Sequence, residues 1–170
     1  MIRNMCVLLI SGLFGGTCLA ASPVCQAMLE AASRVYTTPV HLYTSSATSG
    51  GRTSSSETIY ANHSAYVESN GQWRATPVNP DEVTAMKKRA QAEAGATCAV
   101  VREEPVDGEA AILYRRRATN DDVKIVSQLW VSKKSGLPLK QVIDRDAGES
   151  NKIHQSIRYD YTNVQPPDIH

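Results

Sequence analysis

The side chains that could bind a metal, attack a substrate or hold an anion are scattered along this sequence. His41, His63 and His154 lie at spacings that no metal motif uses, and no Gly-x-Ser-x-Gly turn presents a serine nucleophile. On a strand, Arg115–Arg117 would divide its guanidinium groups between two faces, so the run is a poor anion site. We therefore expect a non-enzymatic protein without cofactor or metal. A triad assembled from distant positions stays an open alternative, although the sequence nominates no nucleophile.

The first twenty residues have the pattern of a Sec-type signal peptide. Arg3 is their only charge, and the apolar run 5–14 that follows is shorter than the roughly 20 residues needed to span a bilayer. A small-x-small cleavage site stands at 18–20. We expect residues 1–20 to be removed during export to the periplasm of a Gram-negative bacterium. Residues 21–170 would then form a single domain with no transmembrane segment.

Two cysteines remain after that cleavage, Cys25 and Cys98. A secreted chain with two cysteines usually joins them, so we expect a disulfide. The chain-entropy model gives such a bridge about 4 kcal/mol of stabilisation. A redox or metal-binding pair is the alternative, but there is no Cys-x-x-Cys and no histidine close to either cysteine.

Charge and composition exclude two classes of partner. The chain has 170 residues, with 18 Lys and Arg against 17 Asp and Glu, and 42% of its residues are hydrophobic. Proteins that bind nucleic acids or anionic membranes need a surplus of cations to displace counterions from phosphates. We therefore expect a globular protein that binds no nucleic acid.

Two segments carry helix signals. Ser22-Pro23 supplies a hydroxyl cap and a proline at the first helical position, which predicts a helix over 23–36. Asn79-Pro80 starts a second helix in the same way, running to about Ala94 with Gly95 as its C′ residue. The apolar face of this second helix is thin, so we expect the helix to lie on the surface and cover something. That face consists of Val83, Met86 and Ala90.

The other ordered segments are typical of β-strands. The stretch 45–56 is so rich in Ser, Thr and Gly that it predicts a loop or a hairpin tip with a disordered end. Asn70-Gly71 between alternating segments predicts a tight hairpin. The segments with a strand-like pattern are 40–44, 57–61, 65–69, 72–77, 98–103, 109–118, 123–132, 137–144 and 152–164. We expect an α+β fold: a curved antiparallel sheet, forming an incomplete barrel of about seven strands, with two helices covering one face.

This order of elements resembles the periplasmic lipoprotein-carrier (LolA-like) superfamily. The resemblance includes a Tyr-x-x-x-x-Gly-x-Trp-like element at 66–73 and, above all, the Leu-Trp-Val-Ser-Lys-Lys-Ser-Gly-Leu-Pro-Leu hairpin at 129–139. It covers most of the mature chain as an order of elements. It implies a strongly curved, incomplete antiparallel barrel with helices as a lid over an apolar cavity. Members of that superfamily bind acyl chains or lipoproteins, or act as sensor domains.

The predicted function is that of a periplasmic binding protein. Its cavity, between curved sheet and helices, would hold a hydrophobic ligand such as a lipid, an acyl chain or a lipoprotein moiety, with an envelope protein as a further partner. The alternative is an envelope interaction or structural module with a filled core and no small ligand. The candidate cavity residues are Tyr60, Tyr66, Trp73, Met86, Leu129, Trp130, Leu137, Leu139, Ile157, Tyr159 and Tyr161.

Overall fold

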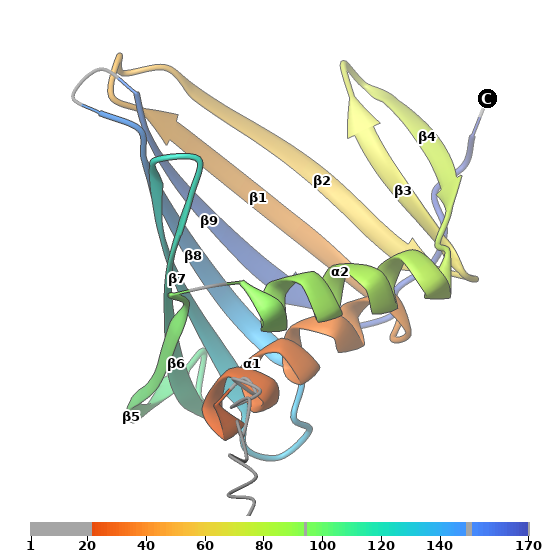
Figure 1. The fold of residues 1–170 in the computed structure, drawn as a ribbon. Coiled ribbons are helices and arrows are strands. Elements are labelled where there is room, and N and C mark those ends of the chain that lie inside the picture. Colours follow the sequence, from red (N-terminus) through yellow and green to blue (C-terminus); the bar gives the residue numbers. More distant parts are fainter. Residues whose placement is uncertain (1–21, 94, 149–150, 170) are drawn as a thin grey trace, which may run out of the picture.

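A computed structural model describes residues 22–93, 95–148 and 151–169 as one curved antiparallel sheet with two helices on its concave face (Figure 1). The strand order is β4-β3-β2-β1-β9-β8-β7-β6-β5, and the edge strands β4 and β5 do not pair, so the barrel is incomplete. The expected α+β class is confirmed, but the sheet has nine strands rather than about seven. The predicted leader, residues 1–20, lies outside the described part of the chain.

Most strands are longer than the sequence pattern predicted, but β4 and β7 match their predicted bounds and β9 ends at Asp160 rather than at residue 164. Their bounds are β1 Val40–Thr48, β2 Thr53–Ala61, β3 Ser64–Ser69, β4 Gln72–Pro77, β5 Thr97–Val106, β6 Glu109–Asn120, β7 Val123–Ser132, β8 Pro138–Asp146 and β9 Lys152–Asp160. In Figure 1, β1, β2, β8 and β9 extend well beyond the helices, so one end of the concave face has no helix over it.

Of the two alternatives predicted for 45–56, the loop is wrong for most of its length and the hairpin is confirmed. β1 and β2 continue through it, with Ser45 opposite Ser55 and Ala47 opposite Thr53. Small hydroxyl side chains usually mark turns, but here β1 also pairs with β9 along its other edge. Pairing on both sides outweighs the weak local preference of these residues.

The helices begin where the sequence predicted and end slightly earlier. α1 spans Pro23–Ser33 and continues as one 3₁₀ turn, η1 (Arg34–Tyr36), while Ser22 Oγ accepts a hydrogen bond from the Cys25 amide over 3.2 Å. α2 spans Pro80–Ala92. The prediction of Gly95 as its C′ residue is wrong, because the backbone is already extended at Glu93.

Two tight turns contain a glycine with positive φ. Asn70 and Gly71 have φ values of 54° and 77°, which confirms the predicted tight hairpin between β3 and β4. The turn between β5 and β6 is confined to Asp107 and Gly108, with φ values of 48° and 84°. Pro105 therefore lies within β5, where an edge strand tolerates its missing N–H.

The buried core is small and lies on both faces of the sheet. On the concave face, Met28 and Ala31 of α1 pack against Leu129 and Val131 of β7. On the convex face, Trp130 packs with Ala111 and Leu113 of β6.

α2 has no buried residue, as its thin apolar face predicted. It packs mainly against α1 rather than on the sheet. Among the described residues, no helix combines the length and the apolar character needed to cross a bilayer.

Candidate ligand-binding site

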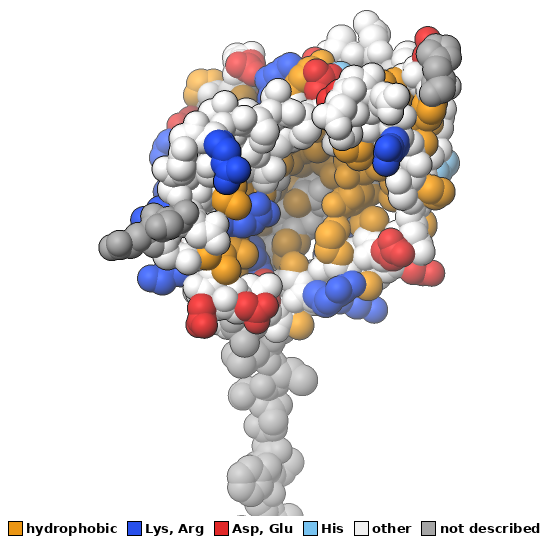
Figure 2. All heavy atoms as spheres, turned by 90° about the horizontal axis from the view of Figure 1, so that it is seen from above, with side chains coloured by type: hydrophobic (Ala, Val, Ile, Leu, Met, Phe, Trp, Pro, Cys, Tyr) orange, Lys and Arg blue, Asp and Glu red, His pale blue; other side chains and the backbone are white. Residues whose placement is uncertain are grey.

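The concave face carries apolar side chains that neither helix covers fully. Leu129 and Val131 contact α1 and so identify this face. From these two residues, the alternation of side chains along each strand and the register between strands identify the other residues on the concave face. None of its outlying members is fully buried: Leu42, Thr58, Tyr60, Val67, Ile125, Ile143, Ile153, Ile157 and Tyr159. Figure 2 shows these surroundings as a hollow lined largely by hydrophobic side chains.

A cavity of about 620 Å³ lies at the helix end of the concave face. It is bordered by η1, the first half of α2, the end of β2 and the β2–β3 turn. Its apolar lining includes Tyr36, Pro39, Tyr60, Ala61, Val78 and Val83, and charged or amide groups of Glu30, Arg34, Asn62, His63 and Lys87 also border it. Small-molecule sites are typically about 300–1,000 Å³, so the cavity is large enough for one.

Several tyrosine side chains near the cavity are buried. Tyr36 and Tyr60 meet edge to face with ring centroids 5.2 Å apart. Burial raises the pKa of Tyr60 to about 12, and the neighbouring Tyr36 phenol adds to that shift. Burial also raises the pKa of Tyr159 and of Tyr161 above the usual tyrosine value. The Tyr159 hydroxyl donates a 2.8 Å hydrogen bond to Gln141 Oε1, so it is desolvated but satisfied.

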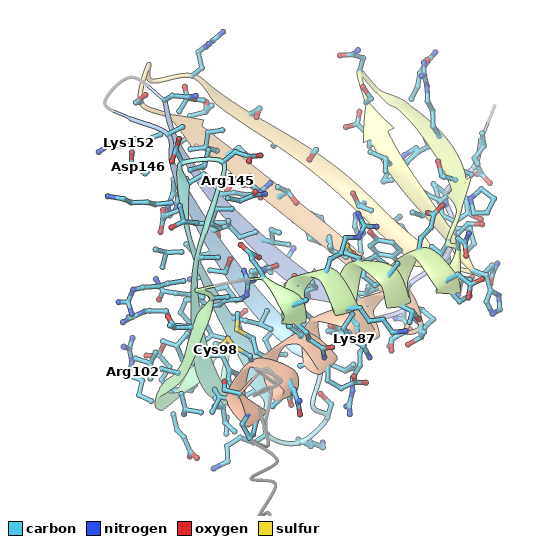
Figure 3. The ribbon with its side chains drawn as sticks, viewed as in Figure 1. Lys87, Cys98, Arg102, Arg145, Asp146 and Lys152 are labelled. Atoms are coloured by element: carbon cyan, nitrogen blue, oxygen red, sulfur yellow. A yellow bond between two sulfur atoms is a disulfide. The ribbon has the colours of Figure 1, made fainter. Side chains whose placement is uncertain are left out.

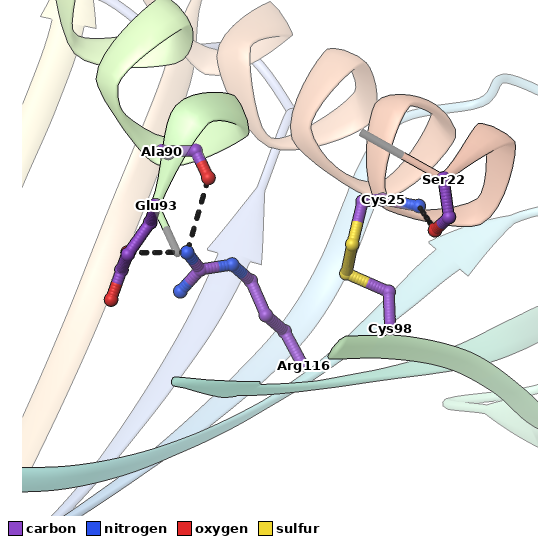
Figure 4. The surroundings of a disulfide bond; sticks show 6 residues. All are labelled: Ser22, Cys25, Ala90, Glu93, Cys98 and Arg116. Carbon is purple, nitrogen blue, oxygen red and sulfur yellow. Dashed lines mark hydrogen bonds and ion pairs between the residues drawn. A yellow bond between two sulfur atoms is a disulfide. The ribbon is translucent and has the colours of Figure 1, made fainter. Parts of the chain in front are cut away.

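Polar contacts hold α2 over the concave face. Lys87 Nζ lies 2.7 Å from Glu30 Oε2 of α1. At the end of α2, Arg116 Nη2 lies 2.5 Å from Glu93 Oε2 and donates to the Ala90 carbonyl over 3.2 Å (Figure 4). The Arg116 side chain is only 11% exposed, so this ion pair is largely removed from solvent. α2 is thus attached mainly through charged groups rather than through a buried apolar face.

The predicted disulfide anchors the other helix. Cys25 of α1 and Cys98 of β5 are bonded, with their Cα atoms 5.1 Å apart. Figure 4 shows this bond beside the Arg116–Glu93 pair, so both helices are attached to the β5–β6 side of the sheet. The prediction of a Cys25–Cys98 bridge is confirmed.

The predicted cavity residues fall in different places. Tyr60 lines the 620 Å³ cavity. Ile157 and Tyr159 lie on the concave face. Leu129 also lies on that face, but α1 covers it completely, so it belongs to the core.

Four predicted cavity residues lie away from the hollow, on the convex side of the sheet: Tyr66, Trp73, Trp130 and Leu139. The Trp130 indole donates to Glu104 Oε1 over 2.5 Å, and Lys140 Nζ lies 5.1 Å from its ring centroid. Alternation explains the separation, because Leu129 and Trp130 are consecutive and must point to opposite faces.

The last three predicted cavity residues lie outside the strands of the sheet. Met86 is 45% exposed on α2. Leu137 lies in the turn between β7 and β8, and Tyr161 follows the end of β9, where its hydroxyl donates to the Pro138 carbonyl over 2.8 Å.

Several contributors to the site were missed in the sequence. Tyr36 was predicted only as the last residue of the first helix. Nothing in the sequence around it indicated a place in a cavity. Leu42 could have been found, because it stands between His41 and Tyr43 on its strand. Ile143 gave no such signal, because it follows Val142 directly.

The charged residues singled out in the sequence do not assemble into a catalytic or metal site. His41 Nε2 lies 2.8 Å from Glu57 Oε2 and His154 Nδ1 lies 2.7 Å from Asp144 Oδ1, in separate pairs on the convex face. Within residues 22–93, 95–148 and 151–169, no three His, Cys, Asp or Glu side chains are grouped to hold a metal. The arginine run is split as expected, with Arg116 alone on the concave face.

One solved structure supports this fold. The crystal structure of lipoprotein LppX from Mycobacterium tuberculosis superposes with a TM-score of 0.52 at 9% identity, covering 88% of this chain and all (100%) of that one. LprF from Mycobacterium bovis gives a TM-score of 0.46 at 11% identity over 88% of this chain and 98% of its own. A LolA superfamily protein from Nitrosomonas europaea gives 0.32 at 12% identity, over 81% and 91%.

No family model and no curated protein matches the sequence. The likeness to LppX agrees with the curved, unclosed antiparallel sheet with two helices that the hairpin at 129–139 led us to expect.

Proposed function

We propose that this protein is a non-enzymatic periplasmic binding protein that holds the acyl chain of a lipid or lipoprotein against the concave face of its sheet. The observation that carries the proposal is the set of concave apolar side chains left only half-buried, next to a 620 Å³ cavity. Apolar area of this kind is costly in water, at roughly 25 cal/mol per Å², and an acyl chain would cover it.

The attachment of α2 supports a site that can admit a bulky ligand. α2 has no buried residue, and its ion pair with α1, Lys87–Glu30, is 30% and 57% exposed, so water can replace this pair at modest cost. The less exposed Arg116–Glu93 pair holds only the end of the helix. α1, in contrast, is fixed by the disulfide and by its contacts with β7. We propose that α2 moves to admit the ligand while α1 stays in place.

A pair of neighbouring substitutions on β9 tests the proposal. Ile157 faces the hollow and Ser156 faces away from it. Ile157→Asp places a charge against the acyl chain, and we expect palmitate binding to weaken by at least about tenfold. Ser156→Asp adds the same charge on the convex face and should leave binding unchanged.

Isothermal titration with palmitate measures both variants, and circular dichroism verifies that each is folded. Equal effects of the two substitutions on palmitate binding would show that the acyl chain does not lie against Ile157 on the concave face. Absence of palmitate and phospholipid binding to the wild-type protein would instead favour an interaction module whose partner is another envelope protein.

A further inference from the structure

Arg145 is a cation among the apolar side chains of the hollow. Arg145 of β8 lies between Ile125 of β7 and Ile153 of β9, its register partners on the concave face. It is half-buried. Figure 3 shows it at the end of the sheet opposite Lys87 of α2, so it marks the open rim of the hollow.

The two carboxylates next to Arg145 in sequence form ion pairs with other residues. Asp144 and Asp146 alternate with it and point to the convex face. Asp144 Oδ1 lies 2.7 Å from His154 Nδ1, and Asp146 Oδ2 lies 3.4 Å from Lys152 Nζ. Among the described residues, no carboxylate forms an ion pair with Arg145.

From this arginine toward the helices, β9 forms a long wall of the hollow. Along β9, Ile153, Ile157 and Tyr159 share the concave face, with Gln155 as the polar side chain among them. The six-residue rise from 153 to 159 corresponds to about 20 Å at about 3.3 Å per residue. A single acyl chain could extend along such a wall with one end at the rim.

We infer that the ligand is an anionic amphiphile whose phosphate or carboxylate binds Arg145 at the rim while its acyl chain runs down the concave face; this inference rests on the proposed function. A planar guanidinium suits the oxygens of a phosphate or carboxylate, which it can bind in a bidentate manner. Partial burial between two isoleucines strengthens that attraction relative to bulk water. A neutral amphiphile fills the same wall but leaves the guanidinium without a partner.

Two amphiphiles with one acyl chain test the inference: 1-palmitoyl lysophosphatidic acid and 1-palmitoylglycerol, which differ by a phosphate. We expect the wild-type protein to bind the phosphate-bearing one at least about tenfold more tightly. Arg145→Gln should remove this preference by weakening the anionic ligand about tenfold and leaving the neutral one unchanged.

Lys124→Gln is the matched control. Lys124 is opposite Asp146 on the convex face, so its loss removes one positive charge from the same end without altering the hollow. The control should keep the wild-type preference. Circular dichroism and thermal unfolding verify that both variants are folded.

The outcomes separate the inference from the function beneath it. If Arg145→Gln keeps the preference, or the wild type binds both amphiphiles equally, the role of Arg145 is overturned while acyl-chain binding stands. If neither amphiphile binds the wild type, both are overturned. Inorganic phosphate is the third ligand to be tested. If it binds as tightly as lysophosphatidic acid, the site binds free anions and the assignment of an amphiphile is overturned.

Discussion

Buried tyrosine hydroxyls tie the stability of this protein to alkaline pH. Burial raises the pKa of Tyr60 to about 12, whereas an unfolded tyrosine titrates near about 10. The folded state therefore favours the neutral phenol, and above about pH 10 the unfolded chain gains by ionising first. The contribution of Tyr60 is complete below about pH 10 and is lost as the pH rises through about 12.

Tyr60→Phe isolates this contribution. The variant lacks the ionisable hydroxyl, so its free energy of unfolding should fall less between pH 9 and pH 11.5, taken as rough limits, than that of the wild type. Urea unfolding at each pH, followed by circular dichroism, measures the difference. Parallel curves for the two proteins would show that the Tyr60 phenol is already hydrated in the folded state.

The ion pair that holds the end of α2 should matter more than the ion pairs at the surface. Arg116→Met leaves the Glu93 carboxylate in a site where the arginine was 11% exposed, and we expect a loss of about 3 kcal/mol. Lys152→Met removes a pair whose side chains are 56% and 46% exposed, which should cost less than about 1 kcal/mol. Urea midpoints measure both, and equal losses would contradict the burial of the Arg116 pair.

Single residues were the hardest part of the site to predict. The sequence shows which strand residues are apolar, but which face is covered by helices depends on the whole sheet. Leu129 and Trp130 were grouped as one site, although alternation alone places them on opposite faces. The cysteine pair was predictable, because an exported chain with two cysteines leaves one pairing.

Among the elements, α1 is the fixed one. The disulfide joins it to β5, and Met28 and Ala31 bury its inner face. Replacing both Cys25 and Cys98 by serine should lower the free energy of unfolding by about 4 kcal/mol on the chain-entropy model. Urea unfolding of the double variant measures this loss.

Hydrogen exchange distinguishes where the double cysteine variant loosens. The amides of α1 should lose protection, while those of β1 and β9, which pair away from the disulfide, should keep theirs at low denaturant. Uniform loss across the sheet would show that the bridge stabilises the entire fold rather than the position of α1.

Helices and turns were more predictable than strand lengths. Ser22-Pro23 and Asn79-Pro80 carry local capping chemistry, and both helices begin there. The continuation of β1 and β2 through 45–56 depends on β9, which is more than one hundred residues away in sequence. No local pattern reports such a partner.

At the scale of the molecule, the two faces of the sheet should respond differently to a ligand. Trp73 and Trp130 are both on the convex side, so we expect palmitate to change the intrinsic tryptophan emission very little. Ile157→Trp places an indole in the hollow, and its emission should shift to shorter wavelength when the ligand excludes water. Ser156→Trp, on the opposite face, is the control.

Fluorescence titration with palmitate compares these variants. A shift confined to Ile157→Trp locates the acyl chain on the concave face. A shift in the wild-type protein, or in Ser156→Trp alone, would place the ligand against the convex face and contradict the proposed site.

The most direct test of the central claim is native mass spectrometry of the protein purified from a periplasm without detergent, followed by solvent extraction and lipid analysis. The half-buried concave face and its cavity predict a bound amphiphile of defined mass that is released on denaturation. A bare polypeptide that also takes up no added fatty acid or phospholipid would contradict the claim that this hollow is a ligand-binding site.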